Sequence, residues 1–246
     1  MHPLPIALLG YGRMGKEIEK TALARGHRIV AKIDREPDWE NQTQGLKEAG
    51  VAIDFSTPAA AASNIARCFD IHLPVVVGTT GWLESLPALQ ERCLHERQAL
   101  FHAANFSIGV HIFLSTARFL SQKMNPLPDY AARIEETHHI HKLDKPSGTA
   151  IRLAETAASQ MTRYRGWRLS ENPSQTACQE VIPVECRRIG ETVGTHRLFF
   201  ESETDSIELT HTAHSRRGFA MGAVLAAEWL CEGRTGCFGM EDMLGI

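Results

Sequence analysis

The chain has 246 residues, of which 43% are hydrophobic and 22% are charged, and its formal net charge is −3 at pH 7. A chain of this length can bury a full hydrophobic core and fits one large domain or two smaller ones. Its composition is that of a soluble globular protein. Because the net charge is small, the chain has no overall electrostatic attraction to nucleic acid or to a membrane surface. We therefore expect neither as a partner.

The cysteines and the start of the chain indicate the compartment. The six cysteines form no C-x-x-C pair and no compact cluster, which is typical of reduced thiols. The first residues lack the basic stretch and the long apolar run of a signal peptide. No run approaches the about 18 apolar residues needed to span a bilayer. These features predict a cytoplasmic protein.

The first part of the chain has the pattern of a βαβ unit. Residues 6–9 form an apolar run of strand length, and Gly10-Tyr11-Gly12-Arg13-Met14-Gly15 follows as a G-x-G-x-x-G match. Residues 16–25 have helical character, and a second strand over residues 28–33 leads to Asp34. The glycines permit a tight turn and close approach of a pyrophosphate, and the acid can accept hydrogen bonds from a ribose. This context favours dinucleotide binding over a purely structural turn.

The alternation of strands and helices continues to about residue 107. Apolar runs over residues 51–55, 74–77 and 100–103 are typical of parallel strands that are buried on both faces. Small and hydroxylic residues gather after such runs, at the sheet edge where open α/β folds bind ligands. We expect this edge to line the nicotinamide end of a dinucleotide with Thr79, Thr80, Asn105 and Phe106. Ordinary turn residues are the alternative interpretation.

The second half of the chain predicts a mixed sheet. A helix over residues 110–123 is followed by a strand over residues 131–137 and by a helix that starts near Ser147. Three β-rich stretches come next without intervening helices, which implies antiparallel pairing in an α+β domain. These stretches are residues 181–188, 195–200 and 206–212, with turns expected at Gly190, Gly194 and residues 203–205.

The last apolar helix predicts a discontinuous first domain. Residues 219–230 are rich in alanine and leucine and can pack back on the first domain. The expected fold class is α/β. Residues 1–107 and 217–246 form the dinucleotide-binding domain, and residues 108–216 form a mixed α+β domain that binds the substrate.

A cluster of basic side chains follows the strand over residues 131–137. Positions 138–145 hold three histidines and two lysines, namely His138, His139, His141, Lys142 and Lys145. The three histidines could be zinc ligands, but on a strand His138 faces away from the other two. No cysteine pair or H-E-x-x-H motif supports a metal. We therefore expect no metal site.

The helix that starts near Ser147 offers a site for an anion. Its first turn has unpaired backbone N–H groups at Gly148 and Thr149, a hydroxyl group and the positive end of the helix dipole. With a cationic loop before it, this start suggests a small ligand that carries at least one carboxylate or phosphate. A solvated loop with an ordinary serine cap is the alternative.

Motifs along nearly the whole chain resemble the 4-hydroxy-tetrahydrodipicolinate reductase family, also called dihydrodipicolinate reductases. The most specific are Glu-Thr-His-His-Ile-His-Lys at 136–142 and Pro-Ser-Gly-Thr at 146–149. The others are the glycine turn at 10–15, Gly-Thr-Thr-Gly at 78–81, Ala-Ala-Asn-Phe-Ser at 103–107, Arg216, and residues 219–224. The resemblance implies a Rossmann-type N-terminal domain and a mixed-sheet domain that forms a homotetramer. It also implies hydride transfer from NADH or NADPH to a six-membered imine ring with two carboxylates, with net loss of water. This step belongs to the diaminopimelate route to lysine.

The resemblance also implies roles for individual residues. His138 would be the acid/base group and Lys142 a second proton donor, and His139, Gly148 and Thr149 would contact the dicarboxylate substrate. The cofactor would be bound by residues of four loops: Gly10, Gly12, Arg13, Met14, Gly15, Asp34, Arg35, Gly78, Thr79, Thr80, Ala103, Ala104, Asn105 and Phe106.

Two neighbouring residues give a mixed indication of cofactor choice. Asp34 can accept hydrogen bonds from the 2′-hydroxyl of NADH, whereas the guanidinium of Arg35 suits the 2′-phosphate of NADPH. We therefore expect both cofactors to be used. An Arg35 that is merely solvated beside Glu36 is the alternative.

The chain departs from the family pattern in three places. Its glycine turn is one residue shorter than that of the longer form in the family. Only about twenty residues separate Asp34 from Asp54, where longer members of the family have an insertion. Lys145 stands where a small residue is expected before Pro-Ser-Gly-Thr. Another NAD(P)-dependent dehydrogenase with a small carboxylated substrate is the strongest alternative, because a fold does not determine its substrate. A non-catalytic NAD-sensing module is disfavoured by the clustered acid/base residues.

Overall fold

The structure, a computed structural model, describes residues 2–170, 180–215 and 217–246. Cys178 and Arg216, for which the sequence predicts a reduced thiol and a family match, lie outside these residues. The chain divides into two compact units, Met1–Ile108 with Arg216–Ile246, and Gly109–Ser215. The five described cysteines are free. Among the described residues, no helix has both the length and the apolar character to cross a membrane.

The first unit is built on a six-stranded parallel sheet with the order β11-β5-β4-β3-β1-β2. The strands are β1 (Pro5–Leu9), β2 (Arg28–Ile33), β3 (Val51–Asp54), β4 (Val75–Val77), β5 (Ala99–His102) and β11 (Gly236–Phe238). The helices are α1 (Arg13–Ala24), α2 (Asp38–Asn41), α3 (Thr43–Glu48), α4 (Pro58–Asp70), α5 (Leu86–His95), α8 (Arg217–Leu230) and α9 (Met240–Leu244), with a 3₁₀ turn over Leu83–Ser85.

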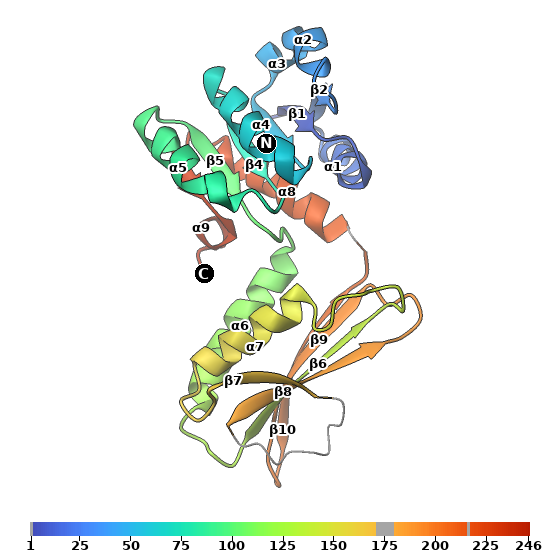
Figure 1. The fold of residues 1–246 in the computed structure, drawn as a ribbon, viewed down its shortest axis with the longest axis vertical. Helices are drawn as coiled ribbons and strands as arrows, with labels where there is room; N and C mark the ends of the chain where they lie inside the picture. Colours follow the sequence, from blue (N-terminus) through green and yellow to red (C-terminus); the bar gives the residue numbers. More distant parts are fainter. Residues whose placement is uncertain (1, 171–179, 216) are drawn as a thin grey trace. The chain divides into compact units, whose positions relative to one another are not determined.

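Helices cover both faces of this sheet (Figure 1). Successive side chains of a strand point to opposite faces. Ile6 and Leu8 of β1 therefore pack with Ile18 of α1 and with α8, whereas Ala7 and Leu9 belong to the core beneath α3, α4 and α5. Burial on both faces explains why these strands are continuous apolar runs.

The second unit has a five-stranded mixed sheet with the order β10-β9-β6-β8-β7. β6 pairs with β9 in antiparallel fashion and with β8 in parallel. Two helices, α6 (Ile108–Met124) and α7 (Gly148–Ser159), pack on one face of the sheet through a shared apolar core. The strands are β6 (Ala131–His138), β7 (Gly166–Ser170), β8 (Val181–Arg188), β9 (Gly194–Glu201) and β10 (Ser206–Ala213). The two sheets confirm the predicted fold class.

Strand β6 directs its end residues to the helix-covered face. Every second residue from Ala132 is buried, which places Ile134, Glu136 and His138 on the side of the core. Glu135, which directly precedes Glu136, is on the opposite face. This alternation brings two polar side chains into the end of an otherwise apolar core.

Several elements differ from the prediction. Gly194, predicted in a turn, begins β9, and a Cβ there would lie only 2.9 Å from His138 Nε2. β8 does not pair with β9, because β6 lies between them. The sequence prediction also lacks α2, α3, α5, α9, β7 and β11. Of these, α2, α3 and β11 have 4, 6 and 3 residues, too few to show a hydrophobic period.

Candidate functional site

The glycine turn between β1 and α1 makes backbone contacts that a side chain would block. Gly10 has a φ of 87°, and a Cβ atom there would lie 2.4 Å from the carbonyl oxygen of Phe55. A Cβ at Gly15 would lie 2.3 Å from the carbonyl oxygen of Gly10. At Gly12, by contrast, a Cβ would meet no protein atom within 4 Å. The turn is therefore closed against the sheet and open at Gly12.

The start of α1 borders a hollow of about 290 Å³ at the carboxyl ends of β3 and β4. Gly12 caps the helix without a side-chain hydrogen bond, and the first turn has no acidic residue. Its free N–H groups and helix dipole can therefore bind an anion such as a pyrophosphate. The hollow is lined by Gly12, Arg13, Met14, Phe55, Ser56, Pro58, Gly78, Thr79 and Thr80. This cradle fits the phosphates of a dinucleotide.

Asp34 and Arg35 are both exposed just after β2. Asp34 Oδ1 accepts a hydrogen bond of 2.8 Å from the backbone N–H of Tyr11, so the acid is tied to the glycine turn. The carboxylate of Asp38 accepts hydrogen bonds from the backbone N–H groups of Asp34 and Arg35, at 2.9 and 2.8 Å. These hydrogen bonds lower the pKa of Asp38. The backbone of this turn is thus held in place, with the Asp34 carboxylate tied to Tyr11 and the side chain of Arg35 exposed.

A buried carboxylate organises the floor of the hollow. Asp54, at the end of β3, is fully buried, and its Oδ1 accepts hydrogen bonds from the hydroxyls of Thr79 (2.6 Å) and Ser56 (2.8 Å). Its Oδ2 accepts a hydrogen bond of 2.8 Å from Asn64. Thr79 and Thr80 both line the hollow; the hydroxyl of Thr79 is engaged with Asp54, and Thr80 is exposed. Asp54 has no predicted role. Its only signal is an acid at the end of an apolar strand.

The side chains of the loop after β5 differ in burial, and one of them lies in the core. Phe106 is 1% exposed, and its ring packs against the rings of Phe55 and Phe101 at centroid distances of 5.6 and 5.8 Å. This ring belongs to the core, which leaves only the backbone of Phe106 for a ligand. Asn105 Oδ1 accepts a hydrogen bond of 2.7 Å from the N–H of Ser107 and fixes the turn. Ala103 is half-buried and Ala104 is exposed.

The three histidines of the basic cluster have different surroundings. His138 ends β6 and is 8% exposed, whereas His139 is half-buried. His141 is exposed, and its Nε2 lies 3.2 Å from Glu191 Oε1. The rings of His139 and His141 are 6.0 Å apart. His138 is therefore the histidine that combines burial with a place at the end of the sheet.

Lys142 is held within the loop that follows β6. Its Nζ donates hydrogen bonds of 2.8 Å to both carboxylate oxygens of Asp144, and Lys142 lowers the pKa of that acid. Arg188 of β8 braces the loop, because its guanidinium donates to the carbonyl oxygens of Lys142 (3.3 Å) and Asp144 (2.6 Å). Lys145 is exposed. A ligand that recruits the ammonium of Lys142 must compete with Asp144.

The start of α7 has the predicted geometry. Ser147 is the N-cap residue, and its hydroxyl accepts a hydrogen bond of 3.2 Å from the N–H of Ala150. The first-turn N–H groups of Gly148 and Thr149 have no partner within the helix. Gly148 is exposed and Thr149 is half-buried, and the first turn contains no acid. This end of α7 can therefore bind a carboxylate.

Three buried side chains at this end of the sheet could bind a metal by residue type. Glu136, His138 and His196 offer ligand atoms within 4.8 Å of one another. They are not the three histidines considered from the sequence. Arg188 Nη2 already donates to Glu136 Oε1 at 3.0 Å, so the guanidinium compensates the charge of the carboxylate without a metal ion. We assign no metal to this group. Glu136, Arg188 and His196 have no role predicted from the sequence.

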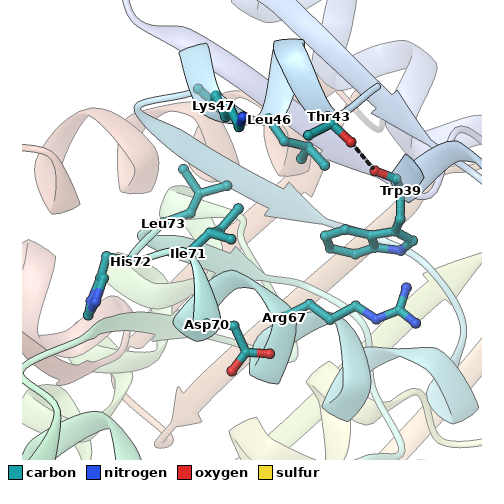
Figure 2. Close-up of a pocket in the computed structure, with 10 residues that line it drawn as sticks. Trp39, Thr43, Leu46, Lys47, Arg67, Asp70, Ile71, His72 and Leu73 are labelled. Atoms are coloured by element: carbon teal, nitrogen blue, oxygen red, sulfur yellow. Dashed lines mark hydrogen bonds between the residues drawn. The ribbon is translucent and has the colours of Figure 1, made fainter. Parts of the chain in front are cut away.

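A second hollow, of about 440 Å³, lies in the first unit beside α3 and the end of α4 (Figure 2). It is lined by Trp39, Thr43, Leu46, Lys47, Ala49, Arg67, Asp70, Ile71, His72 and Leu73. Arg67 lies over the ring of Trp39 at 5.0 Å, and Asp70 pairs with Arg92 at 2.7 Å. None of the predicted site residues lines this hollow.

Two family models match the chain. The model described as "Dihydrodipicolinate reductase, N-terminus" matches residues 4–106. The model described as "Dihydrodipicolinate reductase, C-terminus" matches residues 109–244. Together they cover nearly all of the chain.

Two reductases and one solved structure are similar to this chain over nearly its full length. A 4-hydroxy-tetrahydrodipicolinate reductase from Christiangramia forsetii is 48% identical over 239 residues, which cover 97% of each chain. A protein of the same name from Zymomonas mobilis is 36% identical over 253 residues, which cover 98% of this chain and 97% of the relative. The solved structure of dipicolinate-bound dihydrodipicolinate reductase from Paenisporosarcina sp. TG-14 has a TM-score of 0.76 at 21% identity. It covers 98% of this chain and 99% of that one, and it shows a common fold.

Proposed function

Because the chain belongs to the dihydrodipicolinate reductase family, we propose that it reduces 4-hydroxy-tetrahydrodipicolinate to tetrahydrodipicolinate. The reaction uses NADH or NADPH, releases water and belongs to the diaminopimelate route of lysine biosynthesis. The two family models and the named relatives confirm the family predicted from the motifs. Another dehydrogenase for a small carboxylated substrate stays as the alternative.

The observation that carries the proposal is the arrangement at the end of β6. His138 ends β6, and Lys142 lies in the loop that follows and leads to the open N-terminus of α7. Cationic groups next to free backbone N–H groups suit a small dianion. A relative with the same fold is described with dipicolinate bound, a flat ring that carries two carboxylates. In our proposal Gly148 and Thr149 bind one substrate carboxylate, and His139 contacts the substrate.

In the proposed mechanism, the protein's residues supply binding and proton transfer. When bound, the nicotinamide dinucleotide supplies the hydride. The imidazole of His138 exchanges a proton with the substrate ring. The ammonium of Lys142 leaves Asp144 and stabilises the departing hydroxyl by donating a proton and by its charge.

The glycine turn supports a nicotinamide dinucleotide as the cofactor. Gly10 brings the turn close to the end of β3 and Gly15 brings α1 close to the turn, and the open start of α1 is available to phosphate oxygens. We further propose dual cofactor use. Asp34 and Arg35 are both exposed at the end of β2, where one favours the 2′-hydroxyl of NADH and the other the 2′-phosphate of NADPH. The remaining cofactor contacts come from the loops after β4 and β5.

The homotetramer and the cytoplasmic location are also proposals. The family resemblance supports assembly through the unit Gly109–Ser215, in which α6 and α7 cover one face of the mixed sheet. Cross-linking and analytical ultracentrifugation of the purified protein test the tetramer.

A spectrophotometric assay tests the proposed activity. Purified protein receives enzymatically generated 4-hydroxy-tetrahydrodipicolinate together with NADH or NADPH, and the absorbance of the reduced nicotinamide is followed. We expect absorbance to fall with both cofactors and dipicolinate to inhibit. No fall with either cofactor would exclude the proposed reaction.

A further inference from the structure

We propose that Glu136 is a positioning residue whose carboxylate orients the imidazole of His138 and ties it to the start of α7. This proposal rests on the proposed function, because it takes His138 as the acid/base group. Glu136 is fully buried, so it does not itself meet a substrate. It acts through the groups that its two oxygens contact.

The first of these groups is the ring of His138. Both side chains lie on the helix-covered face of β6, and His138 Nδ1 lies 3.4 Å from Glu136 Oε2. This ring nitrogen is buried and makes no hydrogen bond within the described part of the chain. Hydrogen bonds of catalytic groups are often long without ligand and shorten in the complex. A carboxylate beside Nδ1 favours the tautomer that carries its proton there, which makes Nε2 the nitrogen that exchanges a proton.

The surroundings of Nε2 agree with this assignment. Nε2 lies next to Gly194, where a Cβ atom would be only 2.9 Å away. The absence of a side chain at Gly194 therefore leaves room for the ring at this place. One ring nitrogen faces a carboxylate and the other faces a glycine, which gives the imidazole a defined orientation.

Glu136 is ionised in this setting. Arg188 Nη2 donates to Oε1 at 3.0 Å, and the backbone N–H of Ser147 donates to Oε2 at 3.0 Å. Burial by itself raises the pKa of Glu136, but the nearby side chains of His138, Ser147 and Cys186 and the backbone N–H of Ser147 outweigh it and hold the pKa well below the usual range. A fixed negative charge beside the imidazole stabilises the positive ring that forms during proton transfer.

The same carboxylate connects His138 to the rest of the proposed site. Ser147, which donates to Glu136, is the N-cap residue of α7 and so determines where Gly148 and Thr149 lie. Arg188, the other donor, also binds the carbonyl oxygens of Lys142 and Asp144. Glu136 thus joins the acid/base ring, the loop of the second proton donor and the anion-binding helix start.

The variant Glu136→Gln tests this role. The charge of Arg188 favours the amide oxygen of the new residue on its side, which turns the amide NH₂ toward His138 Nδ1 and toward the N–H of Ser147. The hydrogen bond from Ser147 is then lost, and the proton of the imidazole is favoured on Nε2. We expect kcat to fall about 10- to 100-fold, as for small misplacements of reacting groups. The KM for NADH should stay unchanged, since the glycine turn belongs to the other unit, and dipicolinate should inhibit more weakly. Glu136→Asp retains the charge and should recover part of kcat.

Glu135→Gln is the matched control. Glu135 is the preceding acid of β6 but lies on the opposite face, where it pairs with Arg133 and, at 3.8 Å, with Arg187. The control should keep the kcat and dipicolinate inhibition of the wild type. Equal losses of kcat in Glu135→Gln and Glu136→Gln, or an unchanged kcat in the latter, would overturn the proposal.

Nitrogen-15 NMR of the imidazole gives a readout that does not depend on turnover. The resonances of His138 are assigned from their absence in His138→Asn. We expect the neutral ring of the wild-type protein to carry its proton on Nδ1, and the ring in Glu136→Gln to carry it on Nε2. A wild-type ring protonated on Nε2 would refute the positioning role even if Glu136→Gln failed to fold. If the wild-type protein does not turn over the substrate, the proposed function fails, while this NMR result still decides the role of Glu136.

Discussion

The buried imidazole of His196 should make the protein sensitive to mild acid. His196 is 5% exposed, its Nε2 lies 3.1 Å from the hydroxyl of Ser147, and its ring centroid lies 5.1 Å from that of His138. Burial, followed by the nearby charge of His138, lowers the pKa of His196 from 6.5 to about 4, although Glu136 opposes this change. His211 and Lys142 lower it further. The folded protein therefore keeps this ring neutral.

The sign of the effect follows from proton linkage. Between the unfolded value of 6.5 and the folded value of about 4, the unfolded chain binds more protons at this residue than the folded protein does. Stability from this residue is thus complete above the unfolded pKa and is lost as the pH falls toward the folded one. At about 1.4 kcal/mol per pH unit, the full loss amounts to about 3 kcal/mol, of which about 2 kcal/mol is lost by pH 5.

Urea unfolding of three proteins between pH 7.5 and pH 5 measures this loss. The wild type is compared with His196→Gln, which removes the titrating ring, and with His95→Gln, which removes an exposed one. The free energy of unfolding of the wild type and of His95→Gln should fall by about 2 kcal/mol more than that of His196→Gln. An equal fall in all three proteins would show that His196 is not kept neutral by the fold.

Three further variants test the proposed site. Lys142→Ala should lower kcat by about 10²- to 10⁴-fold, as expected for one positioned proton donor, with the KM for NADH nearly unchanged; steady-state kinetics would disprove the role if kcat stayed near normal. Thr149→Val keeps the shape of the side chain but removes a hydroxyl donor, so it should raise the substrate KM and weaken inhibition by dipicolinate. Equal inhibition of variant and wild type would argue against a carboxylate at the start of α7. Arg35→Ala should raise the KM for NADPH and not that for NADH, and this effect should shrink as salt screens the charge. An unchanged KM for NADPH would remove Arg35 from the cofactor site.

Features that depend on local sequence were predictable. The glycine turn, the second strand at residues 28–33 and the Ser147 cap each follow from a few neighbouring residues, and the structure has β2 and the start of α7 at these positions. A tight turn, an apolar run and a helix cap are determined mainly by the chain itself. The His-His-x-His-Lys and Pro-Ser-Gly-Thr motifs identified the family in the same way.

Features that depend on distant residues were not predictable. Glu136 meets Arg188 and His196 because β6 lies between β8 and β9, an order that no local pattern reveals. Phe106 was predicted to line the nicotinamide end, and the local sequence did not reveal that its ring packs with Phe55 and Phe101 in the core. The roles of these residues emerge only once strand order and face are known.

Identification of the reaction product tests the central claim most directly. Purified protein is incubated with enzymatically generated 4-hydroxy-tetrahydrodipicolinate and reduced cofactor, and the mixture is examined by mass spectrometry alongside the loss of nicotinamide absorbance. The proposed function predicts one molecule of tetrahydrodipicolinate for each NADH or NADPH oxidised, and an initial rate of product formation about 10²- to 10⁴-fold lower when Lys142→Ala replaces the wild type at the same concentration. Unchanged substrate, or cofactor oxidation without tetrahydrodipicolinate, would contradict it.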